Sequence, residues 1–356
     1  MTNLAASLRQ RVQQLKPDHP RLRSRDLATR LGVSELEVVS LDIGHHVTRL
    51  TGDWKSLLQG VKNVGRVMAL TRNAHCVHER KGVYDNLKFY GGAHNMGVAV
   101  NPDIDLRFFM NEWTYGLAIE MDRGKYGILY GLQFYNAKGE AVHKIYTTPS
   151  SKVAAFKRLV ELFTADEQEP IVLTDRSPAA ATVALPDAQI DQVGFQQAWR
   201  NLEDTHDFFS MLKKYEVTRT QGLRMAPEGF TEKVPNEAVV QVLEAAAAGE
   251  VSIMCFVHSK GCIQIHTGPV QQLKTMGDWY NILDEAFNLH LDLSGVHETW
   301  VVKKPTKDGI VTSLELFDAD GNLIVYFFGA RKPGQVELEA WREIIAKVTQ
   351  EAEADV

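Results

Sequence analysis

The chain has 356 residues, enough for about two domains, and its 44% hydrophobic and 24% charged residues exclude wholesale disorder. A net charge of −6 gives no global attraction for nucleic acid or for an anionic membrane. The three cysteines form no Cys-x-x-Cys motif, which argues against a disulfide framework and is typical of a reducing compartment. The N-terminus lacks the pattern of a secretory signal, and no apolar run approaches the ~18 residues of a membrane-spanning helix. We therefore expect a cytoplasmic protein that is not inserted in a membrane.

Residues 1–40 are predicted to be helical. Apolar residues recur every three or four positions over 4–15, and a second helical unit runs over about 24–41. Gly32 breaks this unit, and Ser34 can cap the helix that follows. The same pattern matches a helix-turn-helix, but the mixed charge around it favours a plain helical pair packed on a sheet.

From about residue 66 to 146 the sequence changes to short β-rich runs separated by turn residues. A helix is predicted over 151–163, and 164–193 contain three prolines with little periodicity, as in a linker. A second helical region and a second set of strands follow, and an amphipathic helix over about 337–348 closes the chain. The predicted parts are an N-terminal repeat over 1–170, a linker over 171–193 and a C-terminal repeat over 194–356.

An internal duplication is visible in the residues as well as in the order of elements. LQFYNAKGEAVHKIY (132–146) aligns with LELFDADGNLIVYFF (314–328) at an offset of 182, and both contain a hairpin turn between alternating strands. Two further pairs of strands align at offsets near 180. In the helical parts, the Arg-x4-Arg spacing from Arg25 matches that from Arg219, although this match needs an offset of 194. The common order of the matches indicates an ancient duplication.

Standard catalytic motifs are absent from the sequence: there is no G-x-G-x-x-G after a strand, no Walker A, no G-x-S-x-G and no H-E-x-x-H. Nucleotide binding and serine hydrolysis are therefore not favoured. His75, Cys76 and His78 lie close together, but positions 75 and 78 of a strand point to opposite faces. A metal site there would also need ligands from elsewhere in the chain.

One histidine lies on the apolar stripe of a predicted helix over 194–215. The stripe residues recur at spacings of 4, 3, 4 and 3 and are Phe195, Trp199, Leu202, His206 and Phe209. A histidine on an apolar face is more often a satisfied core residue than a ligand. A neutral imidazole that faces an apolar cavity is also what binds haem iron, and the pattern is compatible with both.

Arg219 follows a predicted helix end near Tyr215 and makes a haem pocket a concrete hypothesis. Such a pocket needs an axial base, apolar walls and cations for the propionates. The C-terminal half offers aromatic and apolar walls and basic residues, namely Phe209, Met211, Phe256, Phe327, Phe328, Lys303, Lys304 and Arg331. Each also has a plainer interpretation, as a core side chain or as a solvated strand end.

Several segments resemble the HemS/ChuS type of cytoplasmic haem-utilisation protein. In the C-terminal half they are THDFF around His206, VTR at 217–219, GCIQIHTGPV at 261–270, KPTKDGIVTSLELFDADG at 304–321 and FFGARKPG at 327–334. In the N-terminal half they are VMALTRNAHCVHERKGVYDN at 67–86 and NPDIDLRFF at 101–109. The resemblance covers nearly the whole chain.

The resemblance implies an α+β fold of two similar halves in tandem, each a large antiparallel sheet with flanking helices. It also implies one haem b, bound mainly in the C-terminal half. The implied proximal ligand of the haem iron is His206, the distal arginine is Arg219, and a second arginine is Arg107. The other implied contacts are the rim cations Lys304 and Arg331 and the wall residue Phe256, to which the residue pattern adds Phe328.

One departure from the family pattern is visible. Some relatives carry a tyrosine near the propionates about six residues before the rim arginine, where this chain has Val325 with Tyr326 next to it. The N-terminal half also shows no equivalent of the helix that bears His206, so a second, symmetric haem site is not implied.

Two activities are compatible with this resemblance. The first is a haem carrier for iron acquisition, which takes haem from an inner-membrane transporter and passes it to a degrading step such as a haem oxygenase. The alternative is a haem-degrading enzyme in which Arg219 and His206 serve the ring cleavage. The enzyme would need an external electron donor, because no flavin or NAD motif is present. Nucleic acid is not an expected partner of either.

Overall fold

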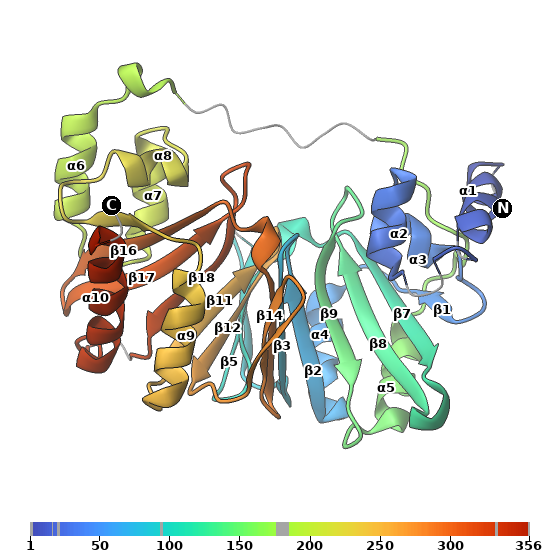
Figure 1. Ribbon diagram of the computed structural model, residues 1–356. Helices are drawn as coiled ribbons and strands as arrows, with labels where there is room; N and C mark the ends of the chain where they lie inside the picture. The colour runs from blue at the N-terminus through green and yellow to red at the C-terminus, as the bar shows by residue number, and fades with distance from the viewer. Residues whose placement is uncertain are drawn as a thin grey trace. The chain divides into compact units, whose positions relative to one another are not determined.

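The computed structural model describes residues 3–15, 17–19, 22–92, 95–175, 185–331 and 334–354, and it consists of two compact units (Figure 1). Unit 1 is made of Met1–Arg72, His78–Ser177 and His258–Gln264. Unit 2 is made of Asn73–Val77, Pro178–Val257 and Ile265–Val356. Each unit therefore includes a short segment from the other half of the sequence. Of the predicted linker, 176–184 lie outside the described residues, whereas Asp187–Gln189 forms the short 3-10 helix η4.

Unit 1 contains five α-helices in the part of the chain described. They are α1 (Asn3–Leu15), α2 (Ser24–Leu31), α3 (Glu35–Ser40), α4 (Trp54–Val61) and α5 (Val153–Phe163), with 3-10 turns η1 (Lys62–Val64), η2 (Met110–Glu112) and η3 (Gly124–Tyr126). Five strands pair in the order β1-β7-β8-β9-β2, all antiparallel. Their bounds are Val47–Arg49, Tyr115–Asp122, Ile128–Tyr135, Ala141–Thr147 and Arg66–Arg72. A second antiparallel set is β4 (Leu87–Tyr90), β5 (Met96–Val100) and β6 (Asp105–Phe109).

Unit 2 repeats this plan. Its helices are α6 (Gln192–Arg200), α7 (Asp207–Lys214), α8 (Arg219–Arg224), α9 (Ala238–Ala248) and α10 (Glu339–Ala354). Its larger antiparallel set is β10 (Thr231–Val234), β16 (Glu298–Thr306), β17 (Gly309–Phe317), β18 (Leu323–Gly329) and β11 (Ile253–His258). The smaller set is β13 (Leu273–Met276), β14 (Trp279–Leu283) and β15 (Phe287–Asp292), which is followed by η5 (Leu293–Gly295). The two remaining strands, β3 (Cys76–Val83) and β12 (Cys262–Gly268), have residues in both units.

The predicted hairpins of the repeat are present in both units and have the same turn. In unit 1, Asn136 Oδ1 accepts hydrogen bonds from the backbone N–H groups of Lys138 and Glu140, both at 3.0 Å. In unit 2, 182 residues further on, Asp318 Oδ1 accepts them at 2.9 and 2.8 Å. A glycine with positive φ follows in each turn, because only glycine adopts that conformation without strain. The duplication read from the sequence is therefore also a duplication of local structure.

The helices of the two units correspond to one another at a different offset from the one that aligns Arg25 with Arg219. Ser34 caps α3 through a capping box with Glu37, and Thr218 caps α8 through the same arrangement with Gln221. These caps lie 184 residues apart, so Glu35, and not an arginine, takes the place of Arg219 in unit 1. The same offset makes α2 the counterpart of α7. A counterpart of the helix after His206 therefore exists in unit 1, which corrects the sequence-based expectation, but it carries no histidine.

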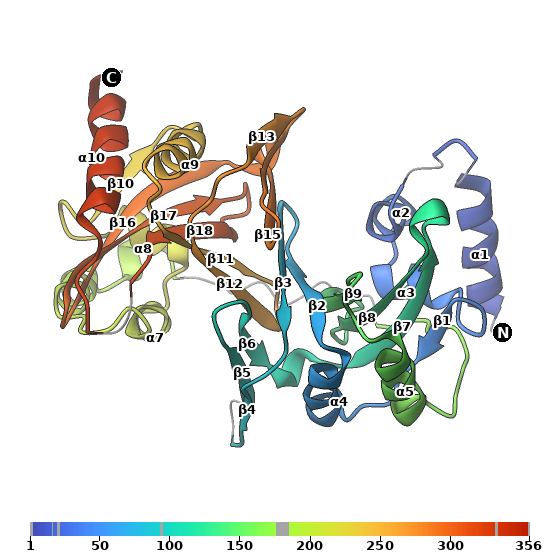
Figure 2. The same ribbon diagram turned by 90° about the horizontal axis from the view of Figure 1, so that it is seen from below.

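The larger sheet of unit 2 has two differently covered faces. One face packs on α9 and α10 in a core that includes Leu314, Val325 and Phe327. The other face packs on α6, α7 and α8 through a core that includes Trp300 and Phe317. Figure 2 shows α7 and α8 on one side of β16–β18, with α9 and α10 on the other. Successive side chains of each strand point to opposite faces, so the position of a candidate residue in its strand decides which face its side chain lies on.

Candidate functional site

His206 lies at a break between two helices, so the prediction of one continuous helix with His206 on its buried stripe is wrong. Helix α6 ends at Arg200 and α7 begins at Asp207, with His206 as its N-cap residue. The chain turns here because the Asp204 carboxylate accepts the backbone N–H of His206 at 2.9 Å. The His206 side chain is 88% exposed, which excludes the interpretation as a satisfied core residue.

The imidazole of His206 is oriented by the same carboxylate. His206 Nδ1 lies 2.6 Å from Asp204 Oδ1, and among the described residues Nε2 has no hydrogen-bond partner. The backbone N–H of His206 and its ring hold the pKa of Asp204 below its ordinary value, so this carboxylate stays ionised. A carboxylate on one ring nitrogen fixes the tautomer and leaves the other nitrogen for a metal, as is usual for metal-ligating histidines. The sequence reasoning missed Asp204, although the Asp-x-His spacing was visible.

Arg219 belongs to a buried ion cluster at the start of α8. Its Nε and Nη2 both donate to the Glu315 carboxylate on β17, each at 2.8 Å. Lys304 on β16 donates to the same carboxylate at 2.6 Å. The side chain of Glu315 is fully buried, and two cations therefore share one anion. Lys304 was expected at a solvent-exposed rim, but it is only 2% exposed, because its strand position faces α7 and α8.

The protonation of this cluster follows from burial and pairing. Burial by itself would raise the pKa of Glu315, but the adjacent Arg219 and Lys304 outweigh it and hold that pKa well below its usual range. Burial lowers the pKa of Lys304 to about 8, while Glu315 acts in the opposite direction. At neutral pH all three groups are charged, and the cluster carries one net positive charge.

An aromatic wall continues the same face onto β18 and β11. Phe256 stacks on Tyr326, with ring centroids 4.8 Å apart and planes 14° apart. The ring of Phe328 meets both edge-on, at 5.4 and 5.5 Å. The guanidinium of Arg219 lies 5.5 Å from the Tyr326 centroid. Because side chains alternate, Tyr326 faces the cluster, whereas Val325 is buried in the core on the other side of the sheet.

Phe208 connects the histidine segment with the ion cluster. It follows His206 by two residues and is buried, with its ring centroid 4.6 Å from Lys304 Nζ and 5.2 Å from Arg219 Cζ. The sequence reasoning instead named the neighbouring Phe209, which is 70% exposed. Of the other candidate walls, Met211 and Phe327 belong to the hydrophobic cores.

The loop before His206 is tied to the turn between β16 and β17. Lys307 donates its backbone N–H to the Glu203 carbonyl at 3.0 Å, and their side chains form an ion pair at 3.1 Å. Arg331 pairs with Asp308 of the same turn at 3.7 Å and contributes to the lowered pKa of Asp204. The structure therefore brings Arg331 to the loop that carries His206.

The remaining predicted residue, Arg107, belongs to unit 1. It lies on β6, where its guanidinium donates to the carboxylate of Asp105. Burial raises the pKa of Asp105, although Arg107 opposes this shift. The structure thus places Arg107 in a different unit from the other predicted site residues.

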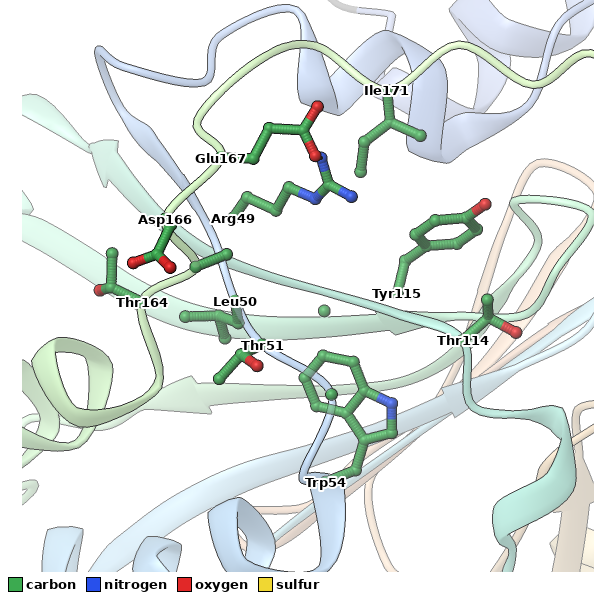
Figure 3. Close-up of a pocket in the computed structure, with 13 residues that line it drawn as sticks. Arg49, Leu50, Thr51, Trp54, Thr114, Tyr115, Thr164, Asp166, Glu167 and Ile171 are labelled. Carbon is green, nitrogen blue, oxygen red and sulfur yellow. The ribbon is translucent and has the colours of Figure 1, made fainter.

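A pocket of about 440 Å³ lies elsewhere, in unit 1. Figure 3 shows Arg49 and Glu167, which form an ion pair at 2.7 Å, above the rings of Tyr115 and Trp54. None of the predicted site residues lines it. A smaller pocket of about 280 Å³ in unit 2 is lined by His75, which pairs with Asp292 at 3.2 Å. In the described part of the chain, no group of three or more His, Cys, Asp or Glu side chains could hold a metal ion, and no helix is long and apolar enough to cross a bilayer.

Comparison with known proteins defines the class and then the family. The model of the haemin-degrading HemS.ChuX domain matches residues 32–163 and 216–348, so the protein is a tandem pair of these domains. The second match begins 184 residues after the first, which is also the offset of the two capping boxes. The chain belongs to the HemS/ChuX family.

Relatives of known function cover almost the whole chain. The hemin transport protein HmuS of Yersinia pestis is 37% identical over 345 residues, which are 96% of this chain and 97% of HmuS. The haem-complexed form of PhuS, a heme-binding protein of Pseudomonas aeruginosa, is 45% identical with a TM-score of 0.91, covering 96% of this chain and 97% of PhuS. ChuS, a heme-degrading enzyme of Escherichia coli O157:H7, is 34% identical with a TM-score of 0.88, covering 97% and 99% of the two chains.

Proposed function

We propose that the protein binds haem b on unit 2 and carries it in the cytoplasm to a haem-degrading step during iron acquisition. The observation that carries this proposal is the pairing of His206 with Asp204, which leaves Nε2 as an exposed nitrogen ligand. The relatives that are named haemin transport and haem-binding proteins support the same ligand.

The residues present suit the chemistry of this ligand. Haem offers iron, a flat apolar ring and two anionic propionates, and it is the cargo here. His206 would supply the axial nitrogen, and the wall of Phe256, Tyr326 and Phe328 would face the ring. The three cysteines are buried, and burial raises the pKa of Cys255 and Cys262, so thiolate ligation of the iron is not favoured.

Cations around this face suit the anionic groups of the ligand. Arg331 is partly exposed beside the His206 loop and could pair with a propionate. Lys304 and Arg219 lie beneath this face and share the single carboxylate of Glu315. The positive charge that remains would attract the anionic groups of the ligand. Arg107, which belongs to unit 1, stays a prediction of the family resemblance.

Haem binding is tested by titrating the purified protein with haemin. We expect a sharp Soret band and one saturable site, and His206→Ala should shift the band and weaken the affinity because the axial nitrogen is lost. His45→Ala is the matched control, since His45 is an exposed loop histidine of unit 1. An unchanged spectrum for His206→Ala would contradict the assignment of the ligand.

Ring cleavage by the protein itself is the second candidate, favoured by the likeness to ChuS and by a charged arginine at the site. The haemin complex is incubated under air with ascorbate, with catalase present to remove free peroxide. A carrier keeps its Soret band under these conditions. Loss of the band, with one iron released per haem, would show that the protein is a haem-degrading enzyme and would contradict the carrier function.

A further inference from the structure

The fully buried Glu315 has a role that neither the family match nor the sequence motifs assign. We propose that Glu315 is the positioning residue of the haem site: its carboxylate holds the Arg219 guanidinium in place. This inference rests on the proposed function, because the ligand that the cluster would face is haem.

The geometry of the carboxylate supports a holding role. Both oxygens of Glu315 accept from Arg219, one of them also accepts from Lys304, and Ser313 Oγ donates to that oxygen at 2.8 Å. A two-point contact between a guanidinium and a carboxylate fixes the direction as well as the position of the arginine. With no exposed surface of its own, Glu315 acts on a ligand only through Arg219 and Lys304.

The other half of the chain shows that the fold does not need a charge at this position. Gln133 of unit 1 lies 182 residues before Glu315, at the matching place of the repeated hairpin, and is also buried. It bonds to the hydroxyl groups of Tyr146 and Tyr135. The position of Arg219 is taken there by Glu35, which pairs with Lys144 at 2.6 Å. The buried carboxylate at this strand position and the arginine at the start of the helix therefore occur together, in unit 2.

The alternative is that Glu315 only stabilises the fold, as buried ion pairs of any kind can do. Unit 2 offers a matched control for this alternative. Glu337 is also buried, accepts the backbone N–H of Thr312 at 2.7 Å and pairs with Arg342 at 3.3 Å. None of these contacts involves the Arg219 cluster, so Glu337→Gln removes a buried carboxylate without touching the site.

The first test uses the protein without haem. We expect the Nε–H signal of Arg219 in ¹H–¹⁵N spectra to be protected from exchange with water, since Glu315 accepts this proton. The signal should lose its protection in Glu315→Gln and keep it in Glu337→Gln. Protection that survives in Glu315→Gln would contradict the holding role, whatever the ligand of the protein.

The second test measures how tightly the haemin complex binds azide, an anionic probe of a nearby positive charge. Arg219→Ala should weaken azide binding by about tenfold. Glu315→Gln should weaken it by about three- to tenfold because the guanidinium is no longer held in place, whereas the loss of a negative charge by itself would strengthen it. The double variant should bind azide no more weakly than Arg219→Ala, since both changes act through one group. Glu337→Gln should leave the azide affinity unchanged.

Two results separate the failure of this inference from that of the proposed function. If the unmodified protein forms no complex with haemin, the proposed function fails, while the arginine spectra still report on the holding role. If haemin binds but Glu315→Gln and Glu337→Gln change azide affinity equally, Glu315 is structural only. Glu315→Asp, which keeps the charge on a shorter side chain, should restore part of the azide affinity, and no recovery would also contradict the proposal.

Discussion

Two short hydrogen-bonded pairs determine what the candidate site can do. Asp204 with His206 presents one imidazole nitrogen to solvent, and Glu315 with Arg219 holds a guanidinium beneath an aromatic wall. The sequence analysis named the histidine and both cations as candidates, but it did not name their carboxylate partners. A lone glutamate in the alternating strand LELF was the available signal for Glu315, because a charge in a buried strand needs a partner.

At the residue scale, Asp204 should tune the ligand strength of His206. We expect Asp204→Ala to weaken haemin affinity by about tenfold, because the ring loses its fixed tautomer and part of its basicity. Asp207→Ala is the matched control, since it removes a neighbouring negative charge at the start of α7, and among the described residues the carboxylate on the imidazole is that of Asp204. Equal losses in the two variants would indicate a general charge effect and would contradict the specific role of Asp204.

At the scale of single elements, strand β9 carries a buried titratable group in unit 1. His143 is fully enclosed, with Nδ1 2.8 Å from Thr71 Oγ1 and Nε2 2.6 Å from the Tyr84 hydroxyl. Burial lowers the pKa of His143 from 6.5 to about 3. The unfolded chain therefore binds a proton between pH 6.5 and 3 that the folded chain does not bind. The contribution to stability is complete above pH 6.5 and is lost as the pH falls below it.

This linkage predicts a pH-dependent free energy of unfolding. Between pH 7 and 5 the histidine should account for a loss of about 2 kcal/mol, at about 1.4 kcal/mol for each pH unit below 6.5. Urea unfolding of His143→Asn at the two pH values should show a loss smaller by that amount, because asparagine does not titrate. His45→Ala should behave like the unmodified protein, and an identical pH dependence in His143→Asn would refute the linkage.

The helix elements show how far the sequence pattern can be followed. Periodicity correctly predicted helical segments on both sides of residues 201–206, but it could not show that the chain breaks there. The break depends on two contacts that the periodicity does not contain. The Asp204 carboxylate accepts the backbone N–H of His206. The Glu203 carbonyl accepts the backbone N–H of Lys307, which lies far away in the chain. Such contacts override helix propensity, which is worth less than about 1 kcal/mol per residue.

At the scale of the whole molecule, the two repeats share a fold but not a charge pattern. The places of Arg219, Glu315 and Tyr326 in unit 2 are taken in unit 1 by Glu35, Gln133 and Lys144. At the offset of 184, the place of His206 is taken by Leu22. The duplicated half therefore lacks the nitrogen ligand, and the charged pair at the corresponding place is Glu35 with Lys144.

This difference between the two units predicts that each chain binds one haem, and the stoichiometry can be measured. Titration at protein concentrations well above the dissociation constant should saturate at one haemin per polypeptide. His206→Ala should lose the tight site, while Leu22→Ala should keep the stoichiometry of the unmodified protein. Two equivalents bound with similar affinity would show that unit 1 has a haem site of its own.

The sequence by itself determined the family, the duplication, the hairpins and the identity of the histidine and arginine candidates. These features follow from local patterns and from motifs that are contiguous in the chain. Only the tertiary structure decided that His206 is exposed, that Lys304 is buried, and that Arg219 meets a carboxylate 96 residues further along the chain. The reason is physical: burial and charge pairing depend on which strands lie under which helices, and alternation along one strand does not contain that information.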